Sequence, residues 1–271
     1  MKFSTLGIKL EISLIYNLEY GYYFNSNRKQ TTFNVNSMKE NSALVFLPSS
    51  PVFNLKEENC FQEMNLEYTS ILFSALYMNY IEIISGENSF TKIYHVFDNN
   101  DESYIPESFL NKLGKNEPYF LNISNEEESL IPFLEKVSDK FSNIYILKTN
   151  SIGFSYQEIK GYSNFLNIEN DILILCKSVS ERINLYAFNN FSPAIITDFQ
   201  SPDLDADTYL KNICTLDKYL FLMRGFYSVE NLNDFKTLYK VLSLKENYSF
   251  CSMEIHNLLT NVFIEYKDLL K

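Results

Sequence analysis

The sequence predicts an α/β protein in which a mainly parallel sheet lies between layers of helices. Two observations lead to this fold class. Short apolar runs rich in β-branched and aromatic residues alternate along the chain with segments of helical periodicity. The stretch 143–176 also fits a strand, a capped helix and a second strand into about 35 residues, the size of a right-handed β–α–β unit.

That central stretch carries the clearest local signals. The apolar runs 144–147 and 172–175 predict two buried strands. Between them, Ser155 and Glu158 have the S-x-x-E spacing of a capping box. In such a box, each side chain accepts a hydrogen bond from a backbone N–H that the start of a helix leaves unpaired. The alternating segment 183–188 predicts either another strand or the rim of the sheet.

Five further elements precede this stretch. Apolar residues recur on one broad face over 61–84, which predicts a long helix. The apolar runs 43–47, 91–97 and 119–123 predict three strands, and a serine–asparagine pair can cap the helix that follows the last of them. The first central strand is therefore expected at 43–47.

The chain reads as one main domain, 41–271, with an extension over residues 1–40. Alternation over 8–14 predicts a half-buried strand. The runs 20–24 and 31–35 flank a polar segment and predict a β-hairpin, which we expect to lie against a sheet edge without a role in ligand binding. No internal repeat and no linker rich in Pro, Gly or Ser divides the rest.

Beyond residue 190 the pattern becomes more helical. Ser228 is the expected N-cap of a helix that continues to Leu242, and a final helix is expected over 252–270. Asp205 and Asp207 have a D-x-D spacing, which can hold a divalent ion. Because they precede a helical pattern, the sequence favours a helix start, where carboxylates are stabilising.

Composition excludes several classes of function. The net charge of −11 argues against nucleic acids and anionic lipids as partners, because both require a basic face. No stretch approaches the roughly 18 consecutive apolar residues of a membrane span. The start of the chain lacks the apolar core of a signal peptide, and the 4 cysteines form no C-x-x-C pair. We therefore expect a cytoplasmic protein with reduced thiols.

Most catalytic schemes find little support. The 2 histidines, His95 and His256, lie near no nucleophile motif, and there is no Walker loop, G-x-G-x-x-G or zinc spacing. His95 falls in the middle of a strand and reads as a core residue. The acidic run 98–102 is more typical of a solvated turn than of a cation site. Paired carboxylates for glycoside hydrolysis stay open, because they need not be close in sequence.

Two stretches in the centre of the chain carry a resemblance. The strand 144–147 runs into Lys148-Thr149-Asn150-Ser151-Ile152, and the second strand runs into the segment 177–185. Their order and spacing resemble a bacterial glycosyltransferase-like family of the GT-A superfamily, the nucleotide-diphospho-sugar transferase fold. That family has G-S-D-S-P at the first place and P-x-x-D-G-G-Y-x-L-x-G at the second.

The polar signature of the family is altered at each motif. Its aspartate falls on Asn150, and its D-G-G falls on Ser180, Glu181 and Arg182. Its nucleotide-wrapping loop, F-x-K-x-P-x-x-G-x-V-K-T-R, corresponds to 46–56, where Pro48 replaces the first lysine, Ser49 follows, the glycine is missing and Lys56 alone remains basic. Its late D-x-D-T-P-E-D-L falls on 225–232, with Gly225 and Tyr227 in place of the aspartates.

The resemblance implies a three-layer GT-A-like (Rossmann-like) fold with a helical C-terminus and a ligand cleft at the carboxyl ends of the strands. It leaves the catalytic residues unassigned and gives no metal ligand. The candidate cleft positions that it implies are Pro48, Ser49, Lys56, Asn150, Ser151, Ser180, Glu181, Arg182 and Tyr227.

Two functions follow from these motifs. The first is a GT-A-like protein with weak or lost catalysis, which binds a nucleotide sugar or another small molecule, binds a protein partner or completes a homo-oligomer. The alternative is an active transferase that moves a sugar from a nucleotide-diphosphate donor through an altered metal site. No cofactor is expected in the first case, and Mg²⁺ or Mn²⁺ only in the second, because an amide at Asn150 lacks the charge that makes a metal site strong.

Overall fold

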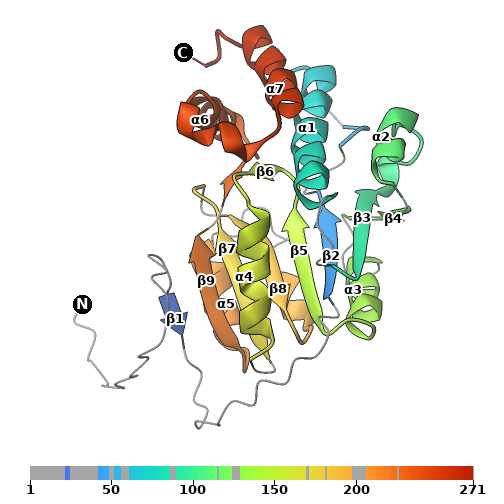
Figure 1. Ribbon diagram of the computed structural model, residues 1–271, viewed down its shortest axis with the longest axis vertical. Coiled ribbons are helices and arrows are strands. Elements are labelled where there is room, and N and C mark those ends of the chain that lie inside the picture. Colours follow the sequence, from blue (N-terminus) through green and yellow to red (C-terminus); the bar gives the residue numbers. More distant parts are fainter. Residues whose placement is uncertain are drawn as a thin grey trace, which may run out of the picture.

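The computed structural model in Figure 1 shows a twisted sheet with helices on both faces. It describes residues 22–24, 42–48, 52–55, 61–85, 90–114, 116–123, 129–168, 171–180, 182–196, 206–224 and 226–270. Among these residues, an 8-stranded sheet has the order β1-β9-β7-β8-β5-β2-β3-β4. Its strands are β1 (Tyr22–Phe24), β2 (Ser42–Leu47), β3 (Lys92–Asp98), β4 (Pro118–Leu121), β5 (Asn143–Lys148), β7 (Ile172–Lys177), β8 (Ile183–Phe188) and β9 (Tyr219–Arg224).

The sheet is mainly parallel, which confirms the predicted fold class. Strands β2 to β5 are parallel to their neighbours on one side of the sheet, and β7 is parallel to β9 on the other. Among the described strands of this 8-stranded sheet, only β8 and the edge strand β1 run the other way. The four strands expected in the interior, namely β2, β3, β5 and β7, all lie there.

The central unit differs from the prediction in one respect. Strands β5 and β7 are parallel but not adjacent, because β8 lies between them and pairs antiparallel with both. The segment 183–188 is therefore a central strand and not the rim of the sheet. All of its residues are buried, since both of its faces are covered. A short turn after Lys177 lets β8 fold back on β7 before it reaches β5.

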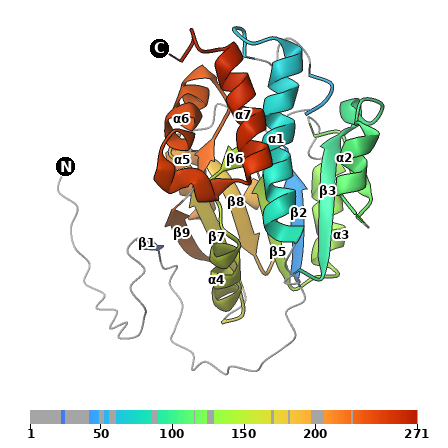
Figure 2. The same ribbon diagram turned by 45° about the horizontal axis from the view of Figure 1, so that its top comes forward.

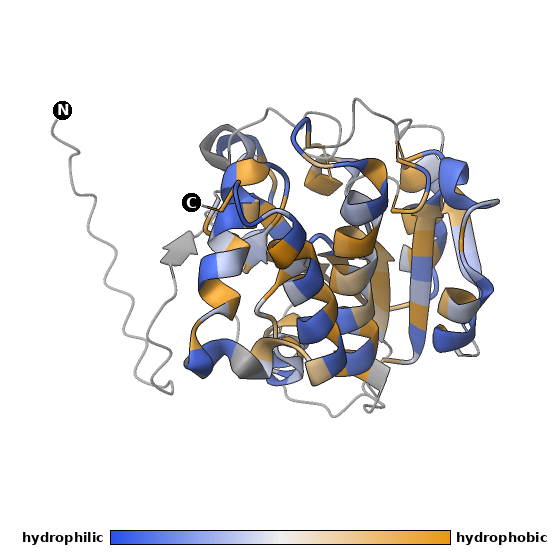
Figure 3. Cartoon of the chain, turned by 90° about the horizontal axis from the view of Figure 1, so that it is seen from above, coloured by the Kyte–Doolittle hydropathy of each residue, from blue (hydrophilic) through white to orange (hydrophobic). Residues whose placement is uncertain are grey.

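Helices cover the two faces of the sheet unequally (Figures 1 and 2). One core contains residues of α1 (Leu66–Ser85), α2 (Glu107–Lys112), α4 (Tyr156–Leu166), α6 (Leu232–Leu242) and α7 (Met253–Glu265). The other contains residues of α3 (Ile131–Ser138) and α5 (Ala206–Ile213). Seen from above in Figure 3, the strands at the centre are largely apolar, whereas the helices alternate between polar and apolar residues.

Two helix starts test the capping predictions. The box at the start of α4 is present as predicted: the Ser155 N–H donates to Glu158 Oε2 at 2.9 Å, and the Glu158 N–H donates to Ser155 Oγ at 3.3 Å. The prediction for α6 is wrong, since Asn231 is its N-cap and accepts from Asn233 N at 2.9 Å and Asp234 N at 3.1 Å. Ser228 does not cap this helix because the first helical residue, Leu232, lies four positions further on, and the Ser228 hydroxyl bonds Ser178 and Ser180 instead.

The acidic turn after β3 is used internally. The buried Asp101 carboxylate accepts the N–H groups of Val52 at 2.8 Å and of Phe53 and Asn54 at 2.7 Å each. Burial raises the pKa of this carboxyl, and the three amide donors act against that shift. Asp98 Oδ2 similarly accepts the Ile123 N–H at 3.2 Å. The turn therefore anchors the segment that follows β2.

The edge strand β1 is the described part of the N-terminal extension. Tyr23 is in register with Phe221 of β9, so the three residues of β1 pair with the sheet edge. The predicted strand 8–14 and the second arm of the hairpin, 31–35, lie outside the described residues. Within the described part of the chain, the helices are all too short or too polar to cross a bilayer.

His95 is a core residue, as the sequence suggests. It is 2% exposed, its ring packs against Phe46 and Tyr77, and its Nδ1 lies 3.2 Å from the Tyr77 hydroxyl. Burial, helped by the nearby charge of Lys92, lowers the pKa of His95 from 6.5 to about 4. The folded protein therefore keeps this imidazole neutral over a pH range in which an unfolded chain protonates it.

This histidine predicts a loss of stability in mild acid. As the pH falls from 6.5 towards 4, His95 binds a proton in the unfolded state but stays neutral in the folded state. The free energy of unfolding therefore falls by about 3 kcal/mol from this group alone. Urea titrations at several pH values measure the effect. The His95→Gln variant should lose correspondingly less over the same range, and equal slopes for the two proteins would contradict the assignment.

Candidate functional site

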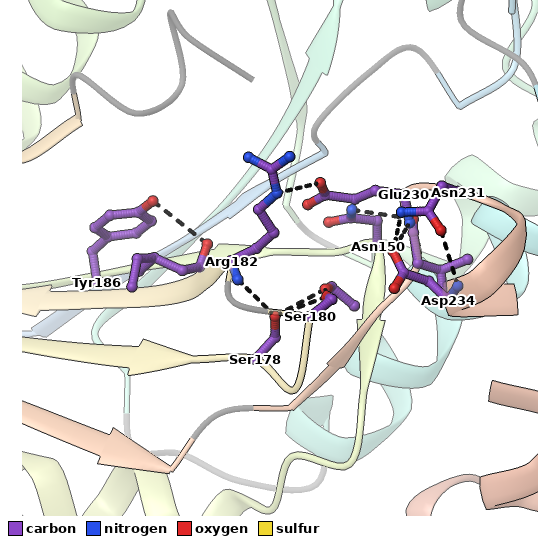
Figure 4. A network of polar contacts seen from close by, with 11 residues as sticks. Asn150, Ser178, Ser180, Arg182, Tyr186, Glu230, Asn231 and Asp234 are labelled. Carbon is purple, nitrogen blue, oxygen red and sulfur yellow. Dashed lines mark hydrogen bonds and ion pairs between the residues drawn. The ribbon is translucent and has the colours of Figure 1, made fainter. Parts of the chain in front are cut away.

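Three segments that are distant in sequence meet at the carboxyl ends of the central strands (Figure 4). Asn150 follows β5, a turn with Ser178 and Ser180 joins β7 to β8, and the segment after β9 returns across them. The return is fixed by a two-stranded sheet of β6 (Ser151–Ile152) and β10 (Tyr227–Ser228). This edge is where an open α/β sheet binds its ligands.

Three serine hydroxyls form the centre of the cluster. Ser228 Oγ donates to Ser178 Oγ at 3.0 Å, and Ser178 Oγ lies 3.1 Å from Ser180 Oγ. Ser180 and Ser228 hydroxyls also contact each other directly. The Arg182 N–H donates to Ser178 Oγ at 3.0 Å, which closes the turn between the strands. These hydroxyls satisfy one another and hold the turn to β10.

Charged groups flank the serines on the side of α6. Arg182 Nε lies 3.2 Å from Glu230 Oε2, and the two side chains are 33% and 25% exposed. Asp234 Oδ2 accepts the Glu230 N–H at 3.1 Å and Asn231 Nδ2 at 3.0 Å. Burial raises the pKa of the Asp234 carboxyl, while the amides of Glu230 and Asn231, then Arg182 and Ser180, act against it. A partly exposed ion pair contributes little to stability, so its effect here is to orient the turn.

Asn150 is tied to the returning segment. Its side chain is 6% exposed, its Nδ2 donates to the Val229 carbonyl at 3.3 Å, and the Val229 N–H donates to the Asn150 carbonyl at 2.8 Å. Its neighbour Ser151 is fully buried, donates to the Lys148 carbonyl at 2.9 Å and bonds the Tyr80 hydroxyl at 2.6 Å. Burial raises the pKa of Tyr80, which therefore stays protonated.

The structure brings together most of the described candidate positions. Those that meet at the cluster are Asn150, Ser151, Ser180, Arg182 and Tyr227. Pro48 is buried at the end of β2, and the adjoining Leu47 carbonyl accepts the Thr149 N–H at 3.2 Å. Ser49, Lys56 and Glu181, and also Asp205 and Gly225, lie outside the described residues.

Several polar residues of this edge escaped the sequence analysis. Ser178, Glu230, Asn231 and Asp234 belong to the network, yet only their contacts across the fold reveal it. Lys148 had a visible signal, since a charged residue ends an otherwise apolar strand. It is 7% exposed, and its Nζ lies 5.7 Å from the centroid of the Tyr186 ring. In the described part of the chain, no group of three or more His, Cys, Asp and Glu side chains could hold a metal ion.

Comparison with known proteins places this geometry in context. No protein-family model matches the chain, and a search of curated proteins gives no match. A solved structure of a proposed nucleotide-diphospho-sugar transferase from Desulfovibrio desulfuricans is similar over 86% of this chain and 97% of that chain, with 12% identity and a TM-score of 0.64.

Two weaker likenesses accompany it. One is to 4-diphosphocytidyl-2C-methyl-D-erythritol synthase from Anaerococcus prevotii, with 14% identity, coverage of 71% and 90% and a TM-score of 0.45. The other is to a Mycobacterium tuberculosis protein, with 9% identity, coverage of 74% and 98% and a TM-score of 0.42. The first likeness and the strand order together define the architecture as that of the nucleotide-diphospho-sugar transferase fold, as the sequence motifs predict.

Proposed function

We propose that the chain is a GT-A-like protein that binds a nucleotide sugar or a related small molecule at the carboxyl edge of its sheet, with weak or lost catalysis. The fold likeness supports the ligand class, although a fold alone does not fix a function. The observation that carries the second half of the proposal is Asn150, which stands where the resembled motif has its aspartate and donates its amide to Val229.

The reason lies in how a transferase handles a diphosphate leaving group. A divalent ion neutralises the charge that develops there, and carboxylates hold that ion. The neutral amide of Asn150 cannot supply this charge, and its Nδ2 is engaged in holding the segment after β9. Ser178, Ser180 and Ser228 likewise hydrogen-bond one another. The cluster is therefore better suited to shaping a binding edge than to metal-assisted transfer.

The alternative of an active transferase has one feature in its favour. Glu230 and Asp234 bring two carboxylates to the same edge of the sheet, on the segment that follows β9. In this structure Glu230 forms an ion pair with Arg182, and Asp234 accepts hydrogen bonds from backbone amides. Metal dependence of ligand binding separates the two functions.

The test is a thermal-shift panel of UDP-, GDP- and dTDP-sugars with and without Mn²⁺. We expect weak stabilisation by at least one of these nucleotide sugars, with no added effect of the metal. A ligand at 100 times its Kd contributes about 2.7 kcal/mol, which corresponds to a rise in Tm of several degrees, at roughly 2–4 °C per kcal/mol.

Matched variants sharpen the panel. A rise of several degrees that requires Mn²⁺, disappears in Asn150→Ala and persists in Asn212→Ala would establish the active-transferase alternative and overturn lost catalysis. Asn212 serves as the control because it is exposed on α5, on the other face of the sheet.

A further inference from the structure

Asn184 of β8 is an unusual residue for the centre of a sheet. It is 1% exposed, and neither its Oδ1 nor its Nδ2 has a hydrogen-bond partner among the described residues. An amide that leaves water without a new partner bears the full cost of desolvation. Such groups are rare in folded proteins and call for an explanation, a ligand being one of them.

The position of Asn184 is set by an irregularity in the sheet. Cys176 of β7 pairs with Leu185 of β8, but the next residue, Lys177, pairs with Ile183. Asn184 is therefore the extra residue of a β-bulge. Bulges re-aim a side chain and are frequent beside functional sites. This bulge lies at the start of β8, next to the turn that carries the serine cluster.

A lysine lies beside the unpartnered amide. Ile146 pairs with Tyr186 and Leu147 with Leu185, so one further step along the antiparallel register sets Lys148 opposite Asn184. Opposite residues of such a pair have Cβ atoms about 4.5–5.5 Å apart. The Lys148 ammonium lies 5.7 Å from the centroid of the Tyr186 ring, on the face of the sheet where Tyr186 packs.

This pairing suits an oxyanion. The Lys148 side chain is only 7% exposed, and a nearly buried ammonium interacts most strongly with an opposite charge. Asn184 Nδ2 can donate to the same anion, while its Oδ1 can accept from a neighbouring hydroxyl of the ligand. A sugar phosphate offers both groups. Relative to the resembled G-S-D-S-P motif, this chain has a lysine in place of the glycine and an amide in place of the carboxylate.

We propose that Lys148 and Asn184 bind the phosphate group of a small-molecule ligand directly, without a metal ion. The lysine then supplies the positive charge that a carboxylate-bound cation provides in a metal-dependent site. The phosphate site itself rests on the geometry of β5 and β8. Only the sugar part of the ligand rests on the function proposed above.

The experiment measures binding of pyrophosphate, inorganic phosphate and glucose 1-phosphate in the presence of EDTA, by calorimetry and thermal shift at constant ionic strength. We expect the wild-type protein to bind at least one of them. Lys148→Met and Asn184→Leu should each weaken this binding at least tenfold, whereas Lys148→Arg should retain most of it.

Two controls match these changes. Lys112→Met removes an exposed lysine that pairs with Glu254 at 3.1 Å, and Asn79→Leu removes another fully buried amide without a partner among the described residues, on α1. Both should bind phosphate as the wild type does.

Several outcomes would overturn the phosphate site. They are no binding by the wild type, equal losses in Lys148→Met and Lys112→Met, and full binding by Asn184→Leu. If Lys148→Met does not fold, Asn184→Leu and Lys148→Arg still decide. Binding of phosphate together with a flat nucleotide-sugar panel would uphold this site and reject the nucleotide-sugar ligand. If a nucleotide sugar binds to Lys148→Met and Asn184→Leu as it binds to the wild type, the result would uphold the nucleotide-sugar ligand and reject this phosphate site.

Discussion

Replacing Asp101 by alanine is expected to lower the free energy of unfolding by about 3–5 kcal/mol, at roughly 1–1.5 kcal/mol for each of the N–H groups it leaves without an acceptor. Val52, Phe53 and Asn54 donate to this carboxylate at 2.7–2.8 Å, and Asp101 itself is fully buried. Among the described residues, these amides have no other acceptor. Urea titration monitored by circular dichroism measures the loss.

The neighbouring residue supplies the control. Glu102 belongs to the same acidic turn but is exposed, so Glu102→Ala should change stability by no more than about 0.5 kcal/mol. Comparable losses in the two variants would mean that the turn acts through its charge and not through the three hydrogen bonds. Asp101→Asn should fall between them, because one amide oxygen remains to accept.

A loss of about 2–5 kcal/mol is expected for Ile174→Ala, through the lost transfer energy and the cavity left behind. Ile174 is fully buried in β7, where Ala187 and Phe221 flank it on the neighbouring strands. Its side chain belongs to the core that α4 covers. Close packing on every side limits the collapse that would relieve the cavity. Chemical denaturation of the two proteins gives the difference directly.

Ile168→Ala removes the same atoms from a side chain that is 50% exposed, at the end of α4. It should cost less than about 1 kcal/mol, because little apolar surface leaves water there on folding. If the two isoleucines cost the same, Ile174 does not occupy the centre of the sheet.

The elements that the sequence predicts well are those with local causes. The capping box at Ser155 forms within four residues. The runs of β2, β5 and β7 are so apolar that these strands must lie in the interior of the protein. Local chemistry and overall fold agree at these positions, so a pattern of a few residues suffices. The approximate meeting of Asn150 with Ser180 and Arg182 also follows from parallel strands ending at one edge.

Long-range choices are not visible in the same way. The position of β8 depends on which strand pairs with the edge of β5. The periodicity of apolar residues does not reveal this, because it is the same for a central strand and for a strand at the rim of the sheet. Asn231 and not Ser228 is the helix cap because Ser228 belongs to β10, where it pairs with Ser151 of β6, 77 positions earlier in the chain. Asp101 reads as a solvated acid until the fold brings Val52 to it. The amide of Asn184 becomes notable only once burial removes its water.

The place of β8 also shapes the order in which the sheet can assemble. Strands β9, β7 and β8 form one block, strands β5, β2, β3 and β4 form another, and the pairing of β8 with β5 is their junction. The β7–β8 hairpin is local and can form in about 1–10 μs, whereas its docking onto β5 must first close the chain around α4. The turn after Lys177 thus belongs both to the proposed ligand edge and to the step that unites the sheet. Substitutions made in this turn to alter binding will therefore also change the rate of folding.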